Sequence, residues 1–169
     1  MCHDRGMARY VLTRNLWSLG GAFAVREAES DRESFRMRRQ ILGVGDKLSL
    51  EDSGGNELAF IRQGLHLGVQ GLCYEISRAG QLAARVNLSS RLRQHLQIET
   101  PDPGRFAVTG DILAMDYQIS HEGRPAASIS APATPDDGSY TVDVAAGQDP
   151  VFVLALAATI ETIHQEQDG

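Results

Sequence analysis

Apolar and polar residues alternate along most of this chain. Leu72, Tyr74 and Ile76 are apolar, and the residues between them are smaller or polar. The same alternation recurs over residues 115–120 and 140–144. Successive side chains of an extended strand point to opposite faces, so a period of two predicts strands that bury one face.

The alternating segments also recur at a regular interval of 24 residues. Leu48, Leu72 and Leu96 follow this interval, and three further columns of mostly apolar residues keep it as well. Turn sequences such as Gly54-Gly55 and Ala79-Gly80 separate the paired segments. Glycine supplies the positive φ that tight hairpins need. Each repeat is therefore interpreted as two strands joined by a turn.

The repeat predicts a mainly β protein of about twelve strands. They are expected near residues 9–14, 22–27, 34–39, 46–52, 57–63, 71–77, 81–87, 94–99, 105–110, 115–120, 125–130 and 139–145. Successive hairpins form an antiparallel meander, and closing a long meander into a barrel removes its two unpaired edges. We therefore predict a closed antiparallel barrel.

One short apolar helix is predicted after the last strand. Asp149 is a good helix cap, and Pro150 fits the first helical turn. The segment Val151–Ile160 that follows has no polar face, and a helix that is apolar all round must be buried. A ring of about twelve strands has an interior too wide for its own side chains to fill, so we expect the helix inside it. The polar residues expected to mark its exit into water are Glu161, His164, Gln165 and Glu166.

The composition is that of a folded globular protein. Hydrophobic residues make up 42% of the chain and charged residues 22%, which is too apolar for a disordered protein. A length of 169 residues favours a single domain, predicted over residues 9–165 after a flexible tail at residues 1–8. The longest apolar run, Val151–Ile160, is far shorter than the roughly 20 residues that cross a bilayer. No transmembrane span is therefore expected.

Charge is distributed unevenly along the chain. The formal net charge is −6, which argues against nucleic acid as a partner. Residues 1–93 hold fourteen basic and ten acidic residues, for a balance of +4, whereas residues 94–169 hold two basic and twelve acidic residues, for a balance of −10. Such a split indicates either a surface that faces a charged partner or a simple drift in composition.

The residues that carry catalysis or bind metals do not form a recognisable pattern. The five histidines are scattered and make no HxxxH or HExxH motif, and there is no GxSxG motif. Gly43-Val44-Gly45 lacks the spacing of a phosphate loop. Cys2 and Cys73 form no CxxC pair, and so few thiols fit a reducing cytosol. We predict no catalytic residue, no metal and no cofactor, and a cytoplasmic location.

The order of several short motifs resembles the LURP-one-related family, which shares its fold with the tubby C-terminal domain and the phospholipid scramblases. The motifs are Arg9–Leu12, Leu16–Gly20, Gly45–Asp52, Tyr74–Ile76, Val108–Asp111, Asp116–Ile119, Tyr140–Val144, Gly147, Asp149 and the apolar helix. The resemblance covers residues 9 to about 165 and implies a twelve-stranded barrel around a C-terminal helix. Relatives of this fold bind phosphoinositides or act on membrane lipids, which is an analogy at the level of fold.

One group of basic residues is a candidate anion-binding site. It consists of Arg36, Arg38, Arg39, Lys47 and Arg62. Arg36 and Arg38 alternate with apolar residues and are expected to point outward, and guanidinium groups suit phosphate oxygens. The alternative is a solvated barrel face that Glu33, Asp46 and Glu51 balance. Trp17 is expected to anchor the first loop or, if exposed, to mark a contact surface.

The leading functional hypothesis is a non-enzymatic binding or scaffold module. Its partner would be an anionic phospholipid headgroup or a protein, and the protein would act in the cytoplasm or peripherally at a membrane surface. A hydrophobic small-molecule carrier is an alternative, but the apolar helix would fill the space that its ligand needs. An enzyme of unknown type is a further alternative, and it would require a pocket lined by polar groups.

Overall fold

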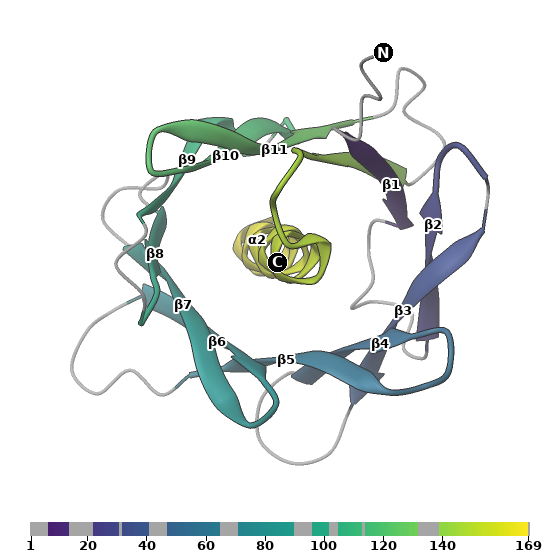
Figure 1. Cartoon of the computed structure of the whole chain (residues 1–169). Helices are drawn as coiled ribbons and strands as arrows, with labels where there is room; N and C mark the ends of the chain where they lie inside the picture. The colour runs from purple at the N-terminus through teal and green to yellow at the C-terminus, as the bar shows by residue number, and fades with distance from the viewer. Residues whose placement is uncertain are drawn as a thin grey trace.

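The computed structural model describes residues 7–13, 22–30, 32–40, 47–64, 71–89, 96–101, 105–112, 114–131 and 139–168. Twelve strands in these residues form one closed antiparallel barrel (Figure 1). The strands are β1 (Ala8–Thr13), β2 (Ala22–Glu27), β3 (Glu33–Gln40), β4 (Lys47–Asp52), β5 (Glu57–Gln63), β6 (Gly71–Arg78), β7 (Gln81–Ser89), β8 (Leu96–Glu99), β9 (Phe106–Asp111), β10 (Asp116–His121), β11 (Arg124–Ser130) and β12 (Ser139–Val144).

Each strand pairs with the next one along the chain, and β1 closes the ring on β12. The closing ladder runs from Ala8 opposite Val144 to Thr13 opposite Ser139, without interruption. The weakest join lies between β8 and β9, where a single register pair connects the two strands, Ile98 with Phe106. The predicted closed barrel is confirmed, and each of the twelve strands lies within two residues of its predicted position.

The hairpin turns have the backbone that the sequence requires. Ala79 and Gly80 both have positive φ, 51° and 78°, and Glu122 and Gly123 likewise have 54° and 78°. Two consecutive residues with positive φ make the turn whose twist matches that of paired strands. Glycine at the second position therefore fixes the register of β6 with β7 and of β10 with β11.

The helix α2 (Pro150–Asp168) runs through the middle of the ring, and Figure 1 shows it end-on. Asp149 caps it: its Oδ1 accepts a hydrogen bond from the N–H of Val151 at 3.0 Å, and its carbonyl accepts one from Val153 at 3.1 Å. Each residue from Val153 to Thr162 is 1% exposed or less. The helix packs mainly against β5, β6, β11 and β12, so apolar surface covers it on opposite sides.

The predicted exit of the helix at Glu161 is wrong, because Glu161 and Thr162 are each only 1% exposed. Burial of the helix continues through Thr162, so the wall of the barrel still covers Glu161. Burial together with the Glu161 charge raises the pKa of the Tyr117 hydroxyl. The side chains of the other residues predicted at the exit, His164, Gln165 and Glu166, lie outside the described part of the chain.

Cys73 on β6 is a buried thiol, only 4% exposed, although it alternates with the side chains that fill the barrel. Gly64 lies beside it, since the N–H of Gly64 donates to the Cys73 carbonyl at 2.8 Å. A Cβ on Gly64 would lie 3.1 Å from the Cys73 Sγ. Burial raises the pKa of this thiol, and Arg85 lowers it by less. The thiol is therefore packed as a small apolar group.

We predict that Leu154→Asp prevents folding. The change places an unpaired charge in the centre of the barrel, at a cost of several kcal/mol against a typical stability of about 5–15 kcal/mol. Circular dichroism and urea denaturation would measure the loss. Leu82→Asp is the matched control, because Leu82 is 38% exposed and should tolerate the charge. A Leu154→Asp protein that unfolds at the parent's midpoint would show that the helix does not fill the barrel.

We predict that Cys73 does not react with Ellman's reagent in the folded protein at neutral pH. Only a thiolate reacts, and the raised pKa together with burial keeps this thiol protonated and covered. The assay would use a Cys2→Ser variant, so that any signal comes from Cys73. One thiol per chain should titrate once denaturant unfolds the protein. Rapid reaction of one thiol without denaturant would refute the prediction.

Candidate functional site

The predicted basic residues lie on three neighbouring strands. Arg36 and Arg38 on β3 are exposed, whereas Met37 between them is fully buried, so both arginines point outward as predicted. Lys47 on β4 lies directly opposite Arg62 on β5. We call these four outward residues of β3, β4 and β5 the basic face. The side chain of Arg39, the fifth predicted member, lies outside the described part of the chain, as does Trp17.

The register brings some members of the basic face together and separates others. Arg38 lies opposite Ser49, the next outward position along β4 from Lys47. Outward positions that are diagonal neighbours on two strands lie about 7–8 Å apart, within reach of long side chains. Arg38, Lys47 and Arg62 therefore form one group, and Arg36 lies farther along the barrel, opposite Glu51.

Glutamates accompany the arginines of the basic face. The Nε of Arg36 lies 2.9 Å from a carboxylate oxygen of Glu33, and the Nε of Arg38 lies 3.4 Å from one of Glu51. A third pair joins Arg62 and Glu75, at 3.7 Å. The three arginine side chains remain 48–56% exposed. Exposed pairs of this kind contribute about 0–1 kcal/mol, so they leave the guanidinium groups able to exchange partners.

Lys47 differs from these arginines in its surroundings. Within the ranges that the structure describes, no carboxylate forms an ion pair with Lys47, and its neighbour across the ladder is the cation Arg62. Like charges directly opposite one another destabilise a sheet by a few tenths of a kcal/mol or more. An anion between them would remove this cost. The arrangement is therefore suited to a phosphate or carboxylate group.

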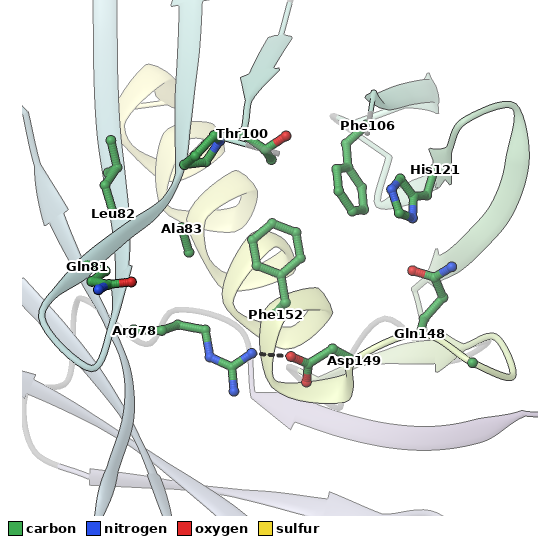
Figure 2. A pocket seen from close by; sticks show the side chains of 12 residues that line it. Arg78, Gln81, Leu82, Ala83, Thr100, Phe106, His121, Gln148, Asp149 and Phe152 are labelled. Atoms are coloured by element: carbon green, nitrogen blue, oxygen red, sulfur yellow. Dashed lines mark hydrogen bonds and ion pairs between the residues drawn. The ribbon is translucent and has the colours of Figure 1, made fainter. Parts of the chain in front are cut away.

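A pocket of about 610 Å³ lies at the end of the barrel where α2 begins. Figure 2 shows its walls: the hairpin of β6 and β7 contributes Arg78 and Leu82, and the facing strands contribute Phe106 and His121. Phe152, in the first turn of α2, points into the space between them. The walls come from segments far apart in sequence, which ring closure brings together. A smaller pocket of about 350 Å³ adjoins the start of β1.

Three aromatic rings form one side of the larger pocket. Phe106 and His121 are register partners on β9 and β10, and their rings stack with centroids 4.1 Å apart and planes 5° apart. The ring of Phe152 lies 5.1 Å from that of Phe106, tilted by 57°. Each of these three side chains is partly exposed, so their faces and edges are accessible from the pocket.

One ion pair lies at the base of the pocket. An Nη atom of Arg78 donates to Oδ2 of Asp149, while Oδ1 of Asp149 caps the helix (Figure 2). Both oxygens of Asp149 are therefore occupied. Arginine has five N–H donors, and this contact uses one nitrogen, so Arg78 retains donors for a further acceptor.

The pattern of residues along the chain does not predict this pocket. Phe106 belongs to one column of the 24-residue repeat and is predicted in a strand, whereas Phe152 belongs to the apolar run and is predicted in the helix. The contact between these two rings depends on where the helix enters the ring of strands. The alternation of apolar and polar residues does not specify that entry point. An aromatic residue at the first turn of an otherwise aliphatic helix was the one available signal, since Phe152 is the only aromatic in that run.

The described residues contain neither a cluster of metal ligands nor a helix that could span a membrane. No group of three or more His, Cys, Asp or Glu side chains is arranged there to hold a metal ion. None of the described helices combines the length and apolar character needed to cross a membrane.

Comparison with known proteins identifies relatives along almost the full chain. YxjI of Bacillus subtilis (strain 168), an uncharacterised protein, is 21% identical over 163 residues, which cover 96% of this chain and 98% of YxjI. The X-ray structure of a protein from Arabidopsis thaliana superimposes with a TM-score of 0.67 at 17% identity, covering 93% of this chain and 91% of that one. At this identity the structural likeness shows the fold alone.

The family is shown by a match to the sequence as a whole. The model of the LURP-one-related family matches residues 8–161, which begins with β1 and ends inside α2. The match therefore includes all twelve strands and the buried part of the helix up to Glu161. The resemblance noted from the short motifs is confirmed, and this chain belongs to the LURP-one-related family.

Proposed function

We propose that this protein is a non-catalytic binding module that recognises an anionic phospholipid headgroup through the basic face. It would act in the cytoplasm, at the surface of a membrane. The observation that carries the proposal is the register pair of Lys47 and Arg62, two cations directly opposite each other on adjacent strands. A phosphate between them would relieve their repulsion and accept charge-assisted hydrogen bonds from both.

The order of strands around the ring supports this proposal. Because each strand neighbours the next in sequence, position along the chain becomes position around the barrel. Strands β1 to β7 hold nine basic and six acidic residues, whereas strands β8 to β12 hold one basic and four acidic residues. These two groups of strands form opposite parts of the ring (Figure 1). A protein with net charge −6 can approach an anionic membrane only with its less acidic side, which carries the basic face.

The existing ion pairs are compatible with such binding. Glu33, Glu51 and Glu75 compete with a headgroup for the arginines, so affinity for a single headgroup should be low. Each basic residue near an anionic surface contributes about 1 kcal/mol, and several would act together. Exposed charges are screened over about 8 Å at physiological ionic strength, so binding should weaken as salt increases.

We predict that the parent protein floats with phosphatidylcholine vesicles that contain phosphatidylserine or a phosphoinositide at low salt. The double variant Lys47→Glu, Arg62→Glu should have an affinity for these vesicles at least about tenfold lower than the parent's, because two attractive contacts become repulsive. The measurement is vesicle flotation at low and physiological salt, with pure phosphatidylcholine vesicles as the blank.

The control is Arg105→Glu, Arg124→Glu, which has the same net charge as the test variant. Both residues are exposed and lie on or beside the strands of the acidic side. The control should retain most of the parent's binding. Equal losses in both variants, or no flotation of the parent at low salt, would refute headgroup recognition. In that case a protein partner becomes the better hypothesis for the basic face.

A further inference from the structure

We propose that the pocket at the mouth of the barrel binds a planar aromatic molecule that carries one carboxylate. The ring would lie against Phe152 and the stacked pair of Phe106 and His121. The carboxylate would accept hydrogen bonds from Arg78. This site is separate from the basic face, which lies on the outer wall of β3, β4 and β5.

The size and position of the pocket suit a small molecule. Its volume of about 610 Å³ lies within the usual range of roughly 300–1,000 Å³ for small-molecule sites. It adjoins the join of β8 and β9, where one register pair replaces the longer ladders seen elsewhere. The hairpin of β6 and β7 forms the facing wall. The pocket therefore lies between the hairpin of β6 and β7 and the strands β9 and β10, beside the first turn of α2.

The aromatic side is the reason for assigning a planar ligand. Phe152 is the one residue between Val151 and Thr162 that is not buried, although the rest of this stretch packs inside the barrel. Its ring extends into the pocket, toward the rings on β9 and β10 (Figure 2). Aromatic rings prefer offset or edge-to-face neighbours at about 4.5–7 Å, and a flat ligand would complete such a cluster. An aliphatic ligand would gain only the burial of its surface.

The charged groups are the reason for assigning a carboxylate. Asp149 already accepts with one oxygen from the N–H of Val151 and with the other from Arg78, so the protein engages both of its oxygens. Arg78 has N–H groups left and a side chain 37% exposed. A planar carboxylate matches the fork of a guanidinium group. Gln81 and Gln148 on the rim supply further neutral donors.

Asp149 would act as an internal competitor for Arg78. It neutralises the arginine when the pocket is empty, and its charge repels an incoming carboxylate. Removing that charge while keeping the helix cap should therefore strengthen binding. Asparagine caps helices about as well as aspartate, so Asp149→Asn separates the two roles of this residue.

The test is a titration of the ¹⁵N-labelled full chain with 2-naphthoate, followed by amide chemical shifts. Shifts should concentrate on the residues around Phe152 and Arg78 and saturate. Two comparison probes isolate the two parts of the proposal: cyclohexanecarboxylate lacks the aromatic ring, and 2-naphthamide lacks the charge. Each should bind several-fold more weakly than 2-naphthoate.

Three variants decide the assignment. Arg78→Gln should weaken 2-naphthoate binding about tenfold, the usual effect of losing a hydrogen bond to a charged group. Asp149→Asn should strengthen binding several-fold, and Arg85→Gln, on the outer wall of β7, should leave it unchanged. Amide spectra of the free variants would confirm that each is folded. No saturable shifts in the parent, shifts centred elsewhere, or weaker binding by folded Asp149→Asn would overturn the proposal.

Discussion

The rest of this structure depends on filling the interior of a wide barrel. A ring of twelve strands encloses more space than its own inward side chains can occupy, and empty apolar space loses dispersion contacts on every side. The segment Val151–Ile160 supplies the missing volume, and the barrel in turn hides a helix that has no polar face. Each part therefore covers apolar surface that the other would expose to water. The sheet and the helix should therefore fold as one cooperative unit.

This constraint places function on the outside of the barrel and at its ends. A hydrophobic carrier would need the volume that Leu154, Leu156 and Ile160 occupy, and all three are fully buried. The surfaces left for binding are the outer wall and the mouth where the helix enters. The basic face belongs to the first and the aromatic pocket to the second. Their chemistry differs accordingly: exchangeable surface ion pairs in one, and partly buried rings beside one arginine in the other.

The strands and their order could be predicted from sequence because their signals are local. Alternation, glycine turns and a 24-residue repeat each refer to residues close together in the chain. The exit of the helix at Glu161 was mispredicted because polarity along one segment does not report the height of the wall around it. The pocket could not be found for a related reason. Arg78 and Asp149 are 71 residues apart, and only the closed ring brings them into contact.

The residues of the basic face could be predicted from the sequence, but not all of their ion pairs. Alternation alone placed Arg36 and Arg38 outward, whereas the register of β3, β4 and β5 places Lys47 and Arg62 beside Arg38. The sequence also indicated that Glu33 and Glu51 would balance these charges, and the structure contains both ion pairs. The pairing of Arg62 with Glu75 depends on the register of β5 with β6, which the loop between them leaves open in the sequence. The strand register therefore decides which of these charged residues are neighbours and form a site.

The mouth pocket is coupled to the fold through the helix. Phe152 and Asp149 reach their positions only when α2 is seated in the barrel, so the unfolded chain has no such pocket. A ligand that binds the folded state alone stabilises it, by about 2.7 kcal/mol at a hundredfold excess over its dissociation constant. The basic face lies on the outer wall of β3, β4 and β5, apart from the helix entry. Ligands of the mouth and of the outer wall should therefore bind independently, since no described contact links Arg78 with Lys47 or Arg62.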